Sequence, residues 1–417
     1  MKATRTPAQI LHADRRYRTD LRTSVRRMTL HARPARPRPF RRTVGVVAVG
    51  VLAFAAAGAA AVYLELESNT AEVDLTALVG DDSTRPPRVE PPEDSRSGSA
   101  VNLLVIGSDD RSGENAAIGG ANDGMSSDTT VVVHVAADRS RVELVSIPRD
   151  LLTDRPQCTL SDGSTTPARQ GRQFNEAFAV GWAQGHDIES ASACTWKTVE
   201  SLTGIRLDGL VLVDFVGLRD MVDAIGGIPI CLPTDLDDER AGLHVKAGAQ
   251  VFNGTTAVQF ARARHDIGDG SDTGRITRQQ DLMAAMARSV LSAQVMTDPT
   301  ALFGFADAAT SAVTASSGFS SIADLTGFGL SLRYLQAEQI VFVSMPTQPA
   351  PSNANRLVAT PAAAELWARL AADQPVGTAP RTDPPTVDPA TPQPVVETPW
   401  SPPGGVLTSA DDSSTCG

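Results

Sequence analysis

The sequence predicts an α/β protein, with one α/β/α layered domain built on a central mixed sheet over about residues 101–372 and one N-terminal transmembrane helix before it. Short β-branched runs bounded by Gly, Asp or Pro indicate strands. The stretches between them have the 3.6-residue periodicity of helices, and strands mixed with helices are typical of α/β domains. A run of 22 residues without a charge near the amino terminus indicates the transmembrane helix.

These patterns place the expected elements along the chain. The expected strands are 101–107, 129–135, 142–148, 209–215, 228–232 and 339–345. The expected helices are 174–185, 194–203, 216–225, 255–263, 273–293, 320–335 and 361–372. We find no internal repeat, so a repeat architecture is not expected.

The charge-free run covers residues 43–64, which as a helix would span roughly 33 Å, enough to cross a bilayer core. Residues 1–42 before it form a basic arm with thirteen Lys/Arg and two acids. The positive-inside rule predicts that this arm is cytoplasmic and that the chain from Glu65 onward lies outside the cell membrane. The alternative is a secretory signal cleaved near Ala59–Ala61, but a 42-residue basic arm is far longer than a usual signal n-region.

Charge is divided sharply along the chain. The formal net charge of −11 combines +11 on the basic arm with −22 on the remainder. Such asymmetry is typical of a tail that binds an anionic surface. Because the arm lacks interleaved aromatic residues and any recognisable nucleic-acid-binding motif, we expect contact with anionic lipid of the cytoplasmic membrane and no nucleic acid.

Two segments have the composition of non-globular chain. Residues 65–100 end in STRPPRVEPPEDSRSGSA, which predicts a flexible extracellular spacer. In residues 373–417 Pro, Thr, Ser and Asp dominate, which predicts a disordered tail. The first of these segments would lift the expected domain off the membrane.

Four cysteines lie on the expected outer side, where disulfides are stable: Cys158, Cys194, Cys231 and Cys416. Four cysteines allow three pairings, and the sequence does not choose among them. We favour a bond between Cys158 and Cys194, which would close the long loop between them. The spacing of the cysteines is not that of a zinc site.

Two aspartates are candidates for a ligand site at the ends of strands. Asp109 follows the run VNLLVIGS, and Asp128 comes just before TTVVVHV. Ligands settle at the carboxyl ends of strands in α/β sheets, so both acids could meet at one edge. Carboxylate pairs of this kind are typical Mg²⁺ ligands, with Mn²⁺ as an alternative. The plain alternative is that each aspartate shapes a turn or caps a helix.

Five side chains further along the chain could donate hydrogen bonds to an anion: Arg149, Arg262, Arg264, Arg275 and Gln279. Arginine binds phosphate oxygens bidentately and keeps its charge. Several arginines beside two carboxylates therefore predict a polyanionic, metal-bridged ligand, above all a pyrophosphate. Taken singly, each arginine is also explained by a surface ion pair, for which Asp150 is a partner beside Arg149.

The spacing of these donors leaves two geometric questions open. Arg262 and Arg264 share a face if the segment is extended but diverge by about 200° if it is helical. Arg275 and Gln279 lie four residues apart, and Leu282 and Met286 continue their helix face. A polar start followed by an apolar stripe suits an amphiphile with an anionic head, although a stripe that faces the core has the same spacing.

Other catalytic patterns are missing from the sequence. There is no G-x-x-x-x-G-K-[ST], no G-x-S-x-G and no H-E-x-x-H. The six histidines are scattered, and His265 is most simply a packing or hydrogen-bonding residue. ATP-binding by a P-loop and zinc-dependent hydrolysis are therefore not expected.

The motifs, in this order, resemble the LytR–CpsA–Psr family of cell-wall glycopolymer ligases. The resemblance covers about 101–372 and includes FNEAFAVGW (174–182), TVESLTGIRLDGLVLVDF (198–215), MVDAIGG (221–227) and the stretch ARARH to GDGSDTGRITRQQ. It implies a membrane-bound enzyme that moves a glycopolymer from a polyprenyl-pyrophosphate carrier to a peptidoglycan hydroxyl and releases polyprenyl phosphate.

The resemblance also implies roles for the candidate residues. Asp109 and Asp128 match the family's acidic Mg²⁺-site residues. The family's pyrophosphate-binding residues are matched by Arg149, Arg262, Arg264, Arg275 and Gln279, so the expected catalytic set is Asp109, Asp128, Arg149, Arg262 and Arg264. The family commonly has arginine two residues before the second aspartate, where this chain has Ser126. Arg111 is one candidate replacement, and the general base stays open.

Two other functions fit the same residues. A hydrolase would use water in place of the sugar hydroxyl and release free polymer phosphate. A non-enzymatic membrane regulator or envelope scaffold is the second alternative. The sequence does not identify the glycopolymer or the form of peptidoglycan that accepts it.

Overall fold

The structure is a computed structural model, and it describes residues 57–58, 60–87, 98–109, 113–119, 124–264, 272–292, 295, 297–377, 402 and 407–408. The predicted membrane-spanning run 43–64 therefore lies mostly outside the described residues. Residues 60–69 are helical. No helix within the described ranges is both long enough and apolar enough to cross a membrane.

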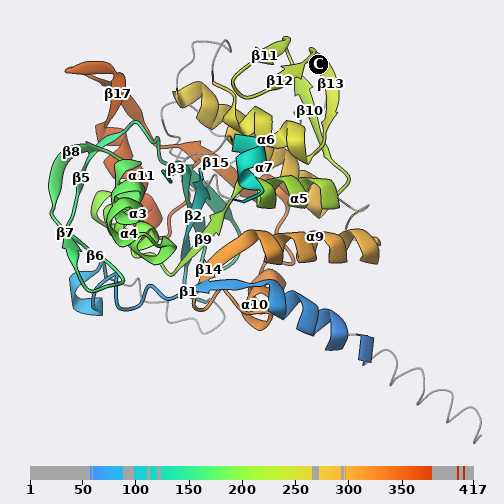
Figure 1. The fold of residues 1–417 in the computed structure, drawn as a ribbon, viewed down its shortest axis with the longest axis horizontal. Helices are drawn as coiled ribbons and strands as arrows, with labels where there is room; N and C mark the ends of the chain where they lie inside the picture. The colour runs from blue at the N-terminus through green and yellow to red at the C-terminus, as the bar shows by residue number, and fades with distance from the viewer. Residues whose placement is uncertain are drawn as a thin grey trace, which may run out of the picture. The chain divides into compact units, whose positions relative to one another are not determined.

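A mixed sheet lies at the centre of the fold (Figure 1), and within the described residues it has eight strands. Its strands, in spatial order, are β1 (Ala71–Val73), β14 (Val313–Ser316), β9 (Gly209–Val213), β2 (Val101–Ser108), β3 (Ser127–Val135), β4 (Val142–Ser146), β15 (Ile340–Ser344) and β18 (Leu407–Thr408). Strands β1 and β14, β9 and β2, and β4 and β15 pair in parallel, while the other neighbours are antiparallel. The predicted mixed sheet is confirmed.

Helices lie on both sides of this sheet, with α3, α4 and α11 on one side and α5, α6 and α7 on the other (Figure 1). The helices are α2 (Asn115–Gly119), α3 (Glu176–Gly185), α4 (Ile188–Thr203), α5 (Phe215–Ala224), α6 (Gly254–Arg262), α7 (Asp272–Leu291), α9 (Pro299–Ala312), α10 (Ile322–Ser331) and α11 (Pro361–Ala371), with short 3-10 turns η1 (Asp82–Thr84) and η2 (Ala337–Gln339). All seven predicted helices are present, six of them within about four residues of their expected bounds, but α4 begins six residues before the expected 194; α2 and α9 were not predicted.

The described part of the chain also contains five two-stranded ribbons. They are β5 (Leu152–Arg155) with β8 (Arg169–Gln173), β6 (Cys158–Thr159) with β7 (Thr165–Thr166), β10 (Ile228–Leu232) with β13 (Gly248–Phe252), β11 (Leu236–Asp238) with β12 (Leu243–Val245), and β16 (Thr347–Ala350) with β17 (Asn353–Ala359). The predicted strand 228–232 thus exists as β10 but belongs to a ribbon and not to the central sheet.

Side-chain alternation along the strands gives the sheet two different faces. One face packs into the main core, and the other, the hollow face, borders a cavity. On β2, Leu104 and Ile106 are fully buried in the main core, which they share with Phe178 of α3, Val199 of α4 and Leu366 of α11. Full burial of such a side chain contributes about 1.5–3 kcal/mol. The residues between them point to the opposite face, since successive side chains of a strand alternate. That opposite face is the one that α5, α6 and α7 cover.

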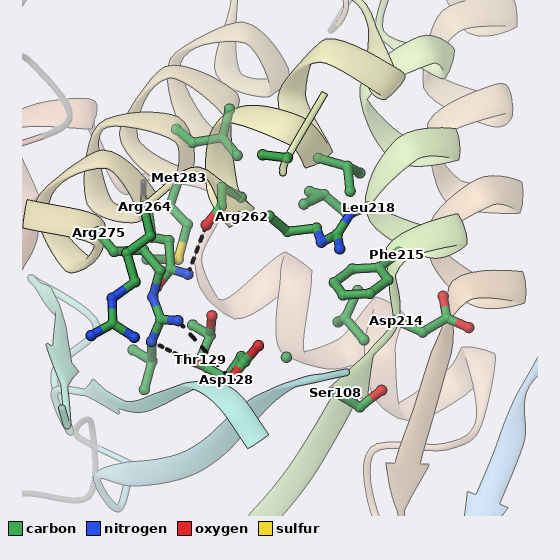
Figure 2. Close-up of a pocket in the computed structure, with 18 of the residues that line it drawn as sticks. Ser108, Asp128, Thr129, Asp214, Phe215, Leu218, Arg262, Arg264, Arg275 and Met283 are labelled. Carbon is green, nitrogen blue, oxygen red and sulfur yellow. Dashed lines mark hydrogen bonds and ion pairs between the residues drawn. The ribbon is translucent and has the colours of Figure 1, made fainter. Parts of the chain in front are cut away.

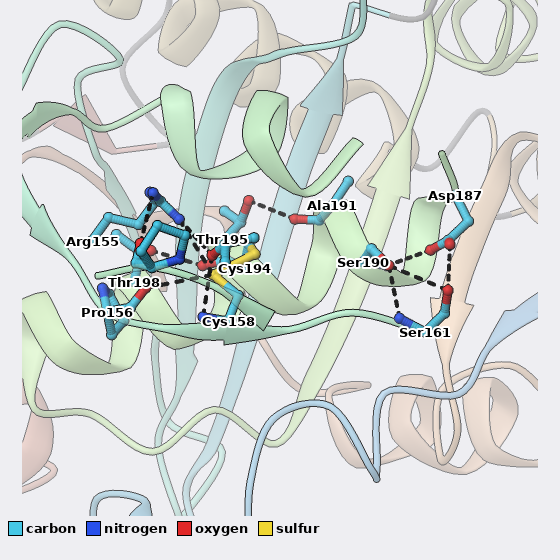
Figure 3. The surroundings of a disulfide bond; sticks show 12 residues. Arg155, Pro156, Cys158, Ser161, Asp187, Ser190, Ala191, Cys194, Thr195 and Thr198 are labelled. Carbon is cyan, nitrogen blue, oxygen red and sulfur yellow. Dashed lines mark hydrogen bonds between the residues drawn. A yellow bond between two sulfur atoms is a disulfide. The ribbon is translucent and has the colours of Figure 1, made fainter. Parts of the chain in front are cut away.

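A disulfide joins Cys158 of β6 to Cys194 of α4, which confirms the pairing that the sequence favoured (Figure 3). Both cysteines are fully buried together with Leu160. Nearby, the backbone N–H of Ser161 donates to Ser190 Oγ at 3.0 Å, and so ties the same ribbon to the start of α4. Cys231 is also disulfide-bonded.

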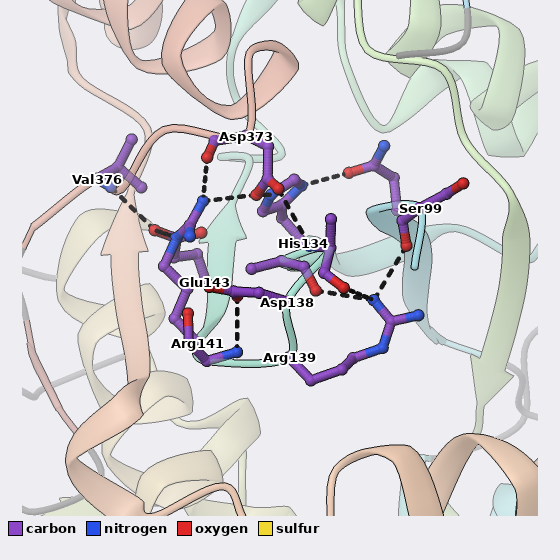
Figure 4. Close-up of polar contacts among 12 residues, drawn as sticks. Ser99, His134, Asp138, Arg139, Arg141, Glu143, Asp373 and Val376 are labelled. Atoms are coloured by element: carbon purple, nitrogen blue, oxygen red, sulfur yellow. Dashed lines mark hydrogen bonds and ion pairs between the residues drawn. The ribbon is translucent and has the colours of Figure 1, made fainter. Parts of the chain in front are cut away.

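The chain after α11 is held by a buried polar network (Figure 4). Asp373 contacts His134 Nε2 at 3.0 Å and Arg141 Nη2 at 2.6 Å. Glu143 accepts a hydrogen bond from the backbone N–H of Val376 at 2.9 Å. Burial raises the pKa of the Glu143 carboxyl, and the positive charge of Arg141 offsets only part of this rise. The network fixes the chain at residues 373–376 against β3 and β4.

Two segment predictions are wrong in part. Residues 65–100 are not wholly a spacer, because β1 joins the central sheet and the apolar residues Val73, Leu75 and Leu78 are buried in the main core. Residues 373–417 are not wholly disordered, because Val376 is fully buried and β18 pairs with β15. In both segments a few apolar side chains within a polar composition gain enough burial to order the backbone.

Candidate active site

Asp109 and Asp128 lie at the same edge of the sheet, where β2 ends and β3 begins. Ser108 pairs with Ser127 and Gly107 with Thr129, so Asp128 is the extra residue of a β-bulge in β3. The backbone N–H of Asp109 donates to the carbonyl oxygen of Ser126 at 2.9 Å, which continues the pairing past the bulge. Bulges of this kind re-aim a side chain beside a functional site.

Gly107 allows the two strands to approach closely at this bulge. A Cβ at this position would lie 3.0 Å from the Cβ of Thr129, at the limit of real contacts. A larger residue would therefore require Thr129, the neighbour of Asp128, to give way by a few tenths of an ångström. The backbone around Asp128 is thus set by a glycine two residues before Asp109.

Two arginines from other elements converge on Asp128. Arg149 follows β4 and donates from Nη1 to Asp128 Oδ1 at 2.7 Å. Arg275, near the start of α7, donates from Nη2 to the carbonyl oxygen of Asp128 at 3.1 Å, and its Nη1 lies 4.0 Å from Oδ1. The Asp128 side chain keeps 28% of its surface exposed, so a ligand can reach it.

Arg262 and Arg264 lie in the same pocket but point to different parts of it, as Figure 2 shows. Helix α6 ends at Arg262, and the next residue is extended. Arg262 stacks over the Phe215 ring at 4.9 Å and donates to the carbonyl oxygen of Ile118 at 2.7 Å. Arg264 lies on the side of Asp128 and Arg275, with Nη2 3.9 Å from the carboxylate of Asp150. The open question of their shared face is answered: they diverge.

These side chains rim a cavity of about 550 Å³ between the hollow face of the sheet and helices α5, α6 and α7 (Figure 2). The polar part is formed mainly by Ser108, Asp128, Arg149, Arg262, Arg264, Arg275 and Gln279. The apolar part is formed mainly by Val105, Val131, Leu218, Met221, Val258, Leu282, Met283 and Met286. Arg275, Gln279, Leu282 and Met286 thus line one cavity, as their spacing on a single helix face allowed.

The predicted site residues do not all have equal access to this cavity. Six of the seven line it, namely Asp128, Arg149, Arg262, Arg264, Arg275 and Gln279. Asp109 is 8% exposed and does not line it, although its neighbour Ser108 does. Gln279 donates from Nε2 to the carbonyl oxygen of Ala261 at 3.1 Å, so it also fixes the end of α6. Arg111 and His265 lie outside the described residues.

Sequence reasoning missed several residues of the site. Phe215 is the first residue of α5. Asp214 precedes it and caps the helix by accepting a hydrogen bond from the Gly217 N–H at 2.7 Å. Asp238 of β11 is 1% exposed and accepts from the backbone N–H of Arg264 at 2.7 Å. A cap before an apolar helix is a readable signal for Asp214, but no local pattern marks Asp238, whose contact spans 26 residues.

The edge at Asp128 has the donor set of a hard cation. The strand register also places Ser108 opposite Ser127, next to Asp109 and Asp128 in the chain. Both hydroxyls are buried and make no hydrogen bond with the described part of the chain. A buried hydroxyl without a partner is costly, and oxygen donors are those that Mg²⁺ prefers. Oxygen donors of the kind that Mg²⁺ prefers are therefore present at this end of the sheet, although Asp109 does not line the cavity that Asp128 lines.

A sequence profile described as the LytR_cpsA_psr family matches residues 62–372. The chain belongs to the LytR–CpsA–Psr family. The family match begins in the helical residues 60–69 and ends just after α11, and so covers the described layered domain except for residues 373–376 and β18. The resemblance carried by the sequence motifs is thereby confirmed.

Two named members of the family are similar to this chain in sequence. The cell wall biosynthesis protein LcpA of Corynebacterium glutamicum is 30% identical over 263 residues, which cover 59% of this chain and 50% of LcpA. TagV of Bacillus subtilis, a polyisoprenyl-teichoic acid–peptidoglycan teichoic acid transferase, is 33% identical over 172 residues, 40% of this chain and 39% of TagV. The chain therefore spans about half the length of these relatives or less.

The fold is also that of a solved family structure. The LytR-Csp2A-Psr enzyme from Actinomyces oris superposes with a TM-score of 0.51 at 21% identity, over 73% of this chain and 96% of that one. At this identity the likeness concerns the arrangement of the sheet and helices alone.

Proposed function

We propose that the protein is a membrane-anchored phosphotransferase that moves a glycopolymer from a polyprenyl-pyrophosphate carrier to peptidoglycan. The observation that carries this proposal is the cavity, whose cationic rim and apolar interior suit an anionic head and a hydrocarbon chain in one molecule. The names of its relatives, which include a teichoic acid–peptidoglycan transferase, support the same donor and acceptor classes.

The reaction requires one bond exchange at phosphorus. A peptidoglycan hydroxyl oxygen attacks the phosphorus that bears the sugar, the bond from this phosphorus to the bridging oxygen breaks, and polyprenyl phosphate leaves with that oxygen. The hydroxyl proton passes to a base that we do not assign. Arg149, Arg264 and Arg275 would bind the phosphoryl oxygens, and catalysis of such transfers depends on positioning and charge neutralisation.

A divalent cation belongs to this proposal. Asp109 and Asp128, with the hydroxyls of Ser108 and Ser127, are the donors that would hold Mg²⁺, or Mn²⁺ in its place. When bound, the ion would neutralise negative charge on the pyrophosphate. The carboxylate of Asp128 also keeps Arg149 in place through the 2.7 Å contact.

The proposed location rests on the amino-terminal sequence. The charge-free run 43–64 after a basic arm supports a single span with the arm in the cytoplasm and the layered domain outside the cell. A membrane-embedded polyprenyl carrier would then have direct access to a domain tethered at the same surface.

The proposal is tested with the whole chain in detergent micelles, a polyprenyl-pyrophosphate-linked oligosaccharide, Mg²⁺ and peptidoglycan. We expect a covalent oligosaccharide–peptidoglycan conjugate and an equal amount of polyprenyl phosphate. Arg275→Ala should abolish both products, while Arg369→Ala on α11, on the other side of the sheet, should leave them unchanged. Free polymer phosphate without conjugate would favour a hydrolase, and neither product would contradict both enzymatic functions.

A scaffold is distinguished in cells that lack the protein. The double variant Arg262→Ala/Arg264→Ala should fail to restore attachment of the polymer if the protein is a ligase. A scaffold would keep its cellular role with this variant. The amount of each variant in the membrane fraction serves as the control for expression.

A further inference from the structure

Strand β17 brings an arginine to the edge of the proposed pyrophosphate site. Leu357 forms a parallel bridge with Leu151, and its backbone N–H donates to the carbonyl oxygen of Asp150 at 3.1 Å. The preceding residue, Arg356, donates from Nη1 to Asp150 Oδ1 at 3.3 Å. Backbone and side-chain contacts therefore both hold Arg356 beside Asp150, although the two residues are 206 positions apart in the chain.

The Asp150 carboxylate is shared among three guanidinium groups. Its Oδ2 lies 3.9 Å from Arg264 Nη2 and 4.0 Å from Arg149 Nε, while Oδ1 faces Arg356. Gln173 of β8 also donates to Oδ1. The Asp150 side chain is 8% exposed, so these contacts are screened little by water. A single buried carboxylate thus lies between two cavity-lining arginines and Arg356, and its negative charge attracts all three.

Arg356 keeps donors available for a ligand. Its Nη1 also donates to the carbonyl oxygen of Asn355 at 3.0 Å. Within the described ranges of the chain, its Nε and Nη2 make no hydrogen bond, and the side chain is 33% exposed. Asp150 and one carbonyl oxygen therefore fix the position of the guanidinium group and occupy only one of its three nitrogens. An arginine held in this way is suited to bind phosphate oxygens.

The position of Arg356 indicates which part of the ligand it meets. Arg149 and Arg264 line the cavity, whereas Asp150 and Arg356 do not. A molecule whose hydrocarbon chain occupies the apolar part places its first phosphoryl group among the cavity-lining arginines. The group beyond that phosphoryl group would then meet the residues next to Arg149 and Arg264, whose guanidinium groups lie 4.0 and 3.9 Å from Asp150.

We propose that Arg356 is a further substrate-binding residue that contacts the phosphoryl group on the sugar side of the pyrophosphate, and that Asp150 is the residue that positions it. This inference rests on the proposed function, because it assumes a pyrophosphate-linked lipid in the cavity. It adds a residue from the carboxyl-terminal ribbon β16–β17 to a site otherwise built from β3, β4, α6 and α7.

The test compares two lipids that differ by one phosphoryl group, geranylgeranyl pyrophosphate and geranylgeranyl monophosphate, by titration calorimetry on the whole chain in detergent with Mg²⁺. Arg356→Ala should weaken binding of the pyrophosphate by about tenfold, the loss expected for one charged hydrogen-bonding group, and leave binding of the monophosphate within about twofold. Arg356→Lys keeps the charge but not the planar fork, so it should fall between wild type and alanine.

Asp150→Asn tests the positioning role. The amide can still accept from Gln173 but carries no charge to hold the three arginines. We expect the preference for pyrophosphate over monophosphate to fall, together with some loss of melting temperature because the buried arginines lose their counter-charge. A lower melting temperature with an unchanged preference would mean that Asp150 only supports the fold.

Matched controls separate the possible failures. Arg369→Ala removes an arginine of similar exposure, 30%, that pairs with Glu365 on α11, and it should change neither affinity. Arg275→Ala should weaken binding of both lipids. If wild type binds both lipids and Arg356→Ala binds them equally well, Arg356 is not a binding residue and the proposed function stands. If wild type binds neither lipid, the proposed function fails and this inference fails with it.

Discussion

Asp128 Oδ1 accepts a 2.7 Å hydrogen bond from Arg149 Nη1, and the bulge in β3 is what turns this carboxylate toward the arginine that follows β4. The contact joins the beginning of β3 to the residues that follow β4. Because β3 and β4 are antiparallel neighbours, both ends lie at one edge of the sheet. The bulge thus places the Asp128 carboxylate, which could bind a cation, beside an arginine that could bind an anion.

Asp128→Asn should lower the rate of conjugate formation by about 100-fold, the loss typical of a removed electrostatic contact in a transition state. Asparagine has about the size of aspartate but no negative charge. It would therefore attract Arg149 and a divalent cation less strongly. The melting temperature should change little, since the side chain is part-exposed. Glu365→Gln, which neutralises an exposed carboxylate on α11, serves as the control. A rate within twofold of wild type would remove Asp128 from the site.

Met283→Trp should fill the apolar part of the cavity. Met283 lies on α7 beside Leu282 and lines the cavity without being fully buried, so the indole replaces empty space and not packed side chains. We expect the KM for a long-chain polyprenyl donor to rise by about tenfold, as for a loss of about 1.4 kcal/mol of binding, with a smaller rise for a short-chain donor. Leu330→Trp on α10, exposed and outside the cavity, should leave KM unchanged.

The Cys158–Cys194 bond should contribute strongly to stability. It closes a loop over a sequence separation of 36 residues, for which chain entropy gives about 3–4 kcal/mol. The double variant Cys158→Ala/Cys194→Ala should lose about this free energy of unfolding in a urea titration. Variants are preferred to a reducing agent because Cys231 is disulfide-bonded as well. An unchanged unfolding midpoint would show that the packing around Leu160 holds the ribbon on α4 without the bond.

The sequence predicted the central strands and most helices because their signals are local. The run 129–135 is almost continuously β-branched, and it lies within β3. Asp128, in contrast, was expected just before that strand and lies inside it. A bulge depends on the register with the neighbouring strand, which the alternation of side chains does not specify. Short edge strands such as β1 have too few residues to carry a pattern.

The candidate site was predictable where residue type and chemistry decided it. Arg149, Arg264 and Arg275 were chosen as phosphate donors, and the structure places all three along the polar part of one cavity. Arg356 was not predicted, because its contact with Asp150 depends on a single bridge between β17 and the residue before β5. A contact between residues so far apart in the chain leaves no trace in local spacing.

Asp373 should make the stability of the fold depend on pH, and this residue does not line the cavity. Burial by itself raises the pKa of this carboxyl, but hydrogen bonds from His134 and the Ala137 N–H, with the charge of Arg141, outweigh it, so the pKa lies below the usual aspartate value of 3.8. A carboxyl with a lowered pKa in the folded state stabilises the fold at pH values above its unfolded pKa. This stabilisation is lost as the pH falls through the folded value.

Asp373→Asn should therefore lower the free energy of unfolding by about 1 kcal/mol at neutral pH. The residue has a positive φ of 51°, which asparagine tolerates, so the substitution changes the charge without straining the backbone. The difference between the two proteins should shrink as the pH falls below 3.8, where the wild-type carboxyl also becomes neutral. Urea titrations at a series of pH values measure this difference, with Asp138→Asn in an exposed turn as the control. A difference that stayed constant with pH would show that Asp373 acts through the shape of its side chain and not through its charge.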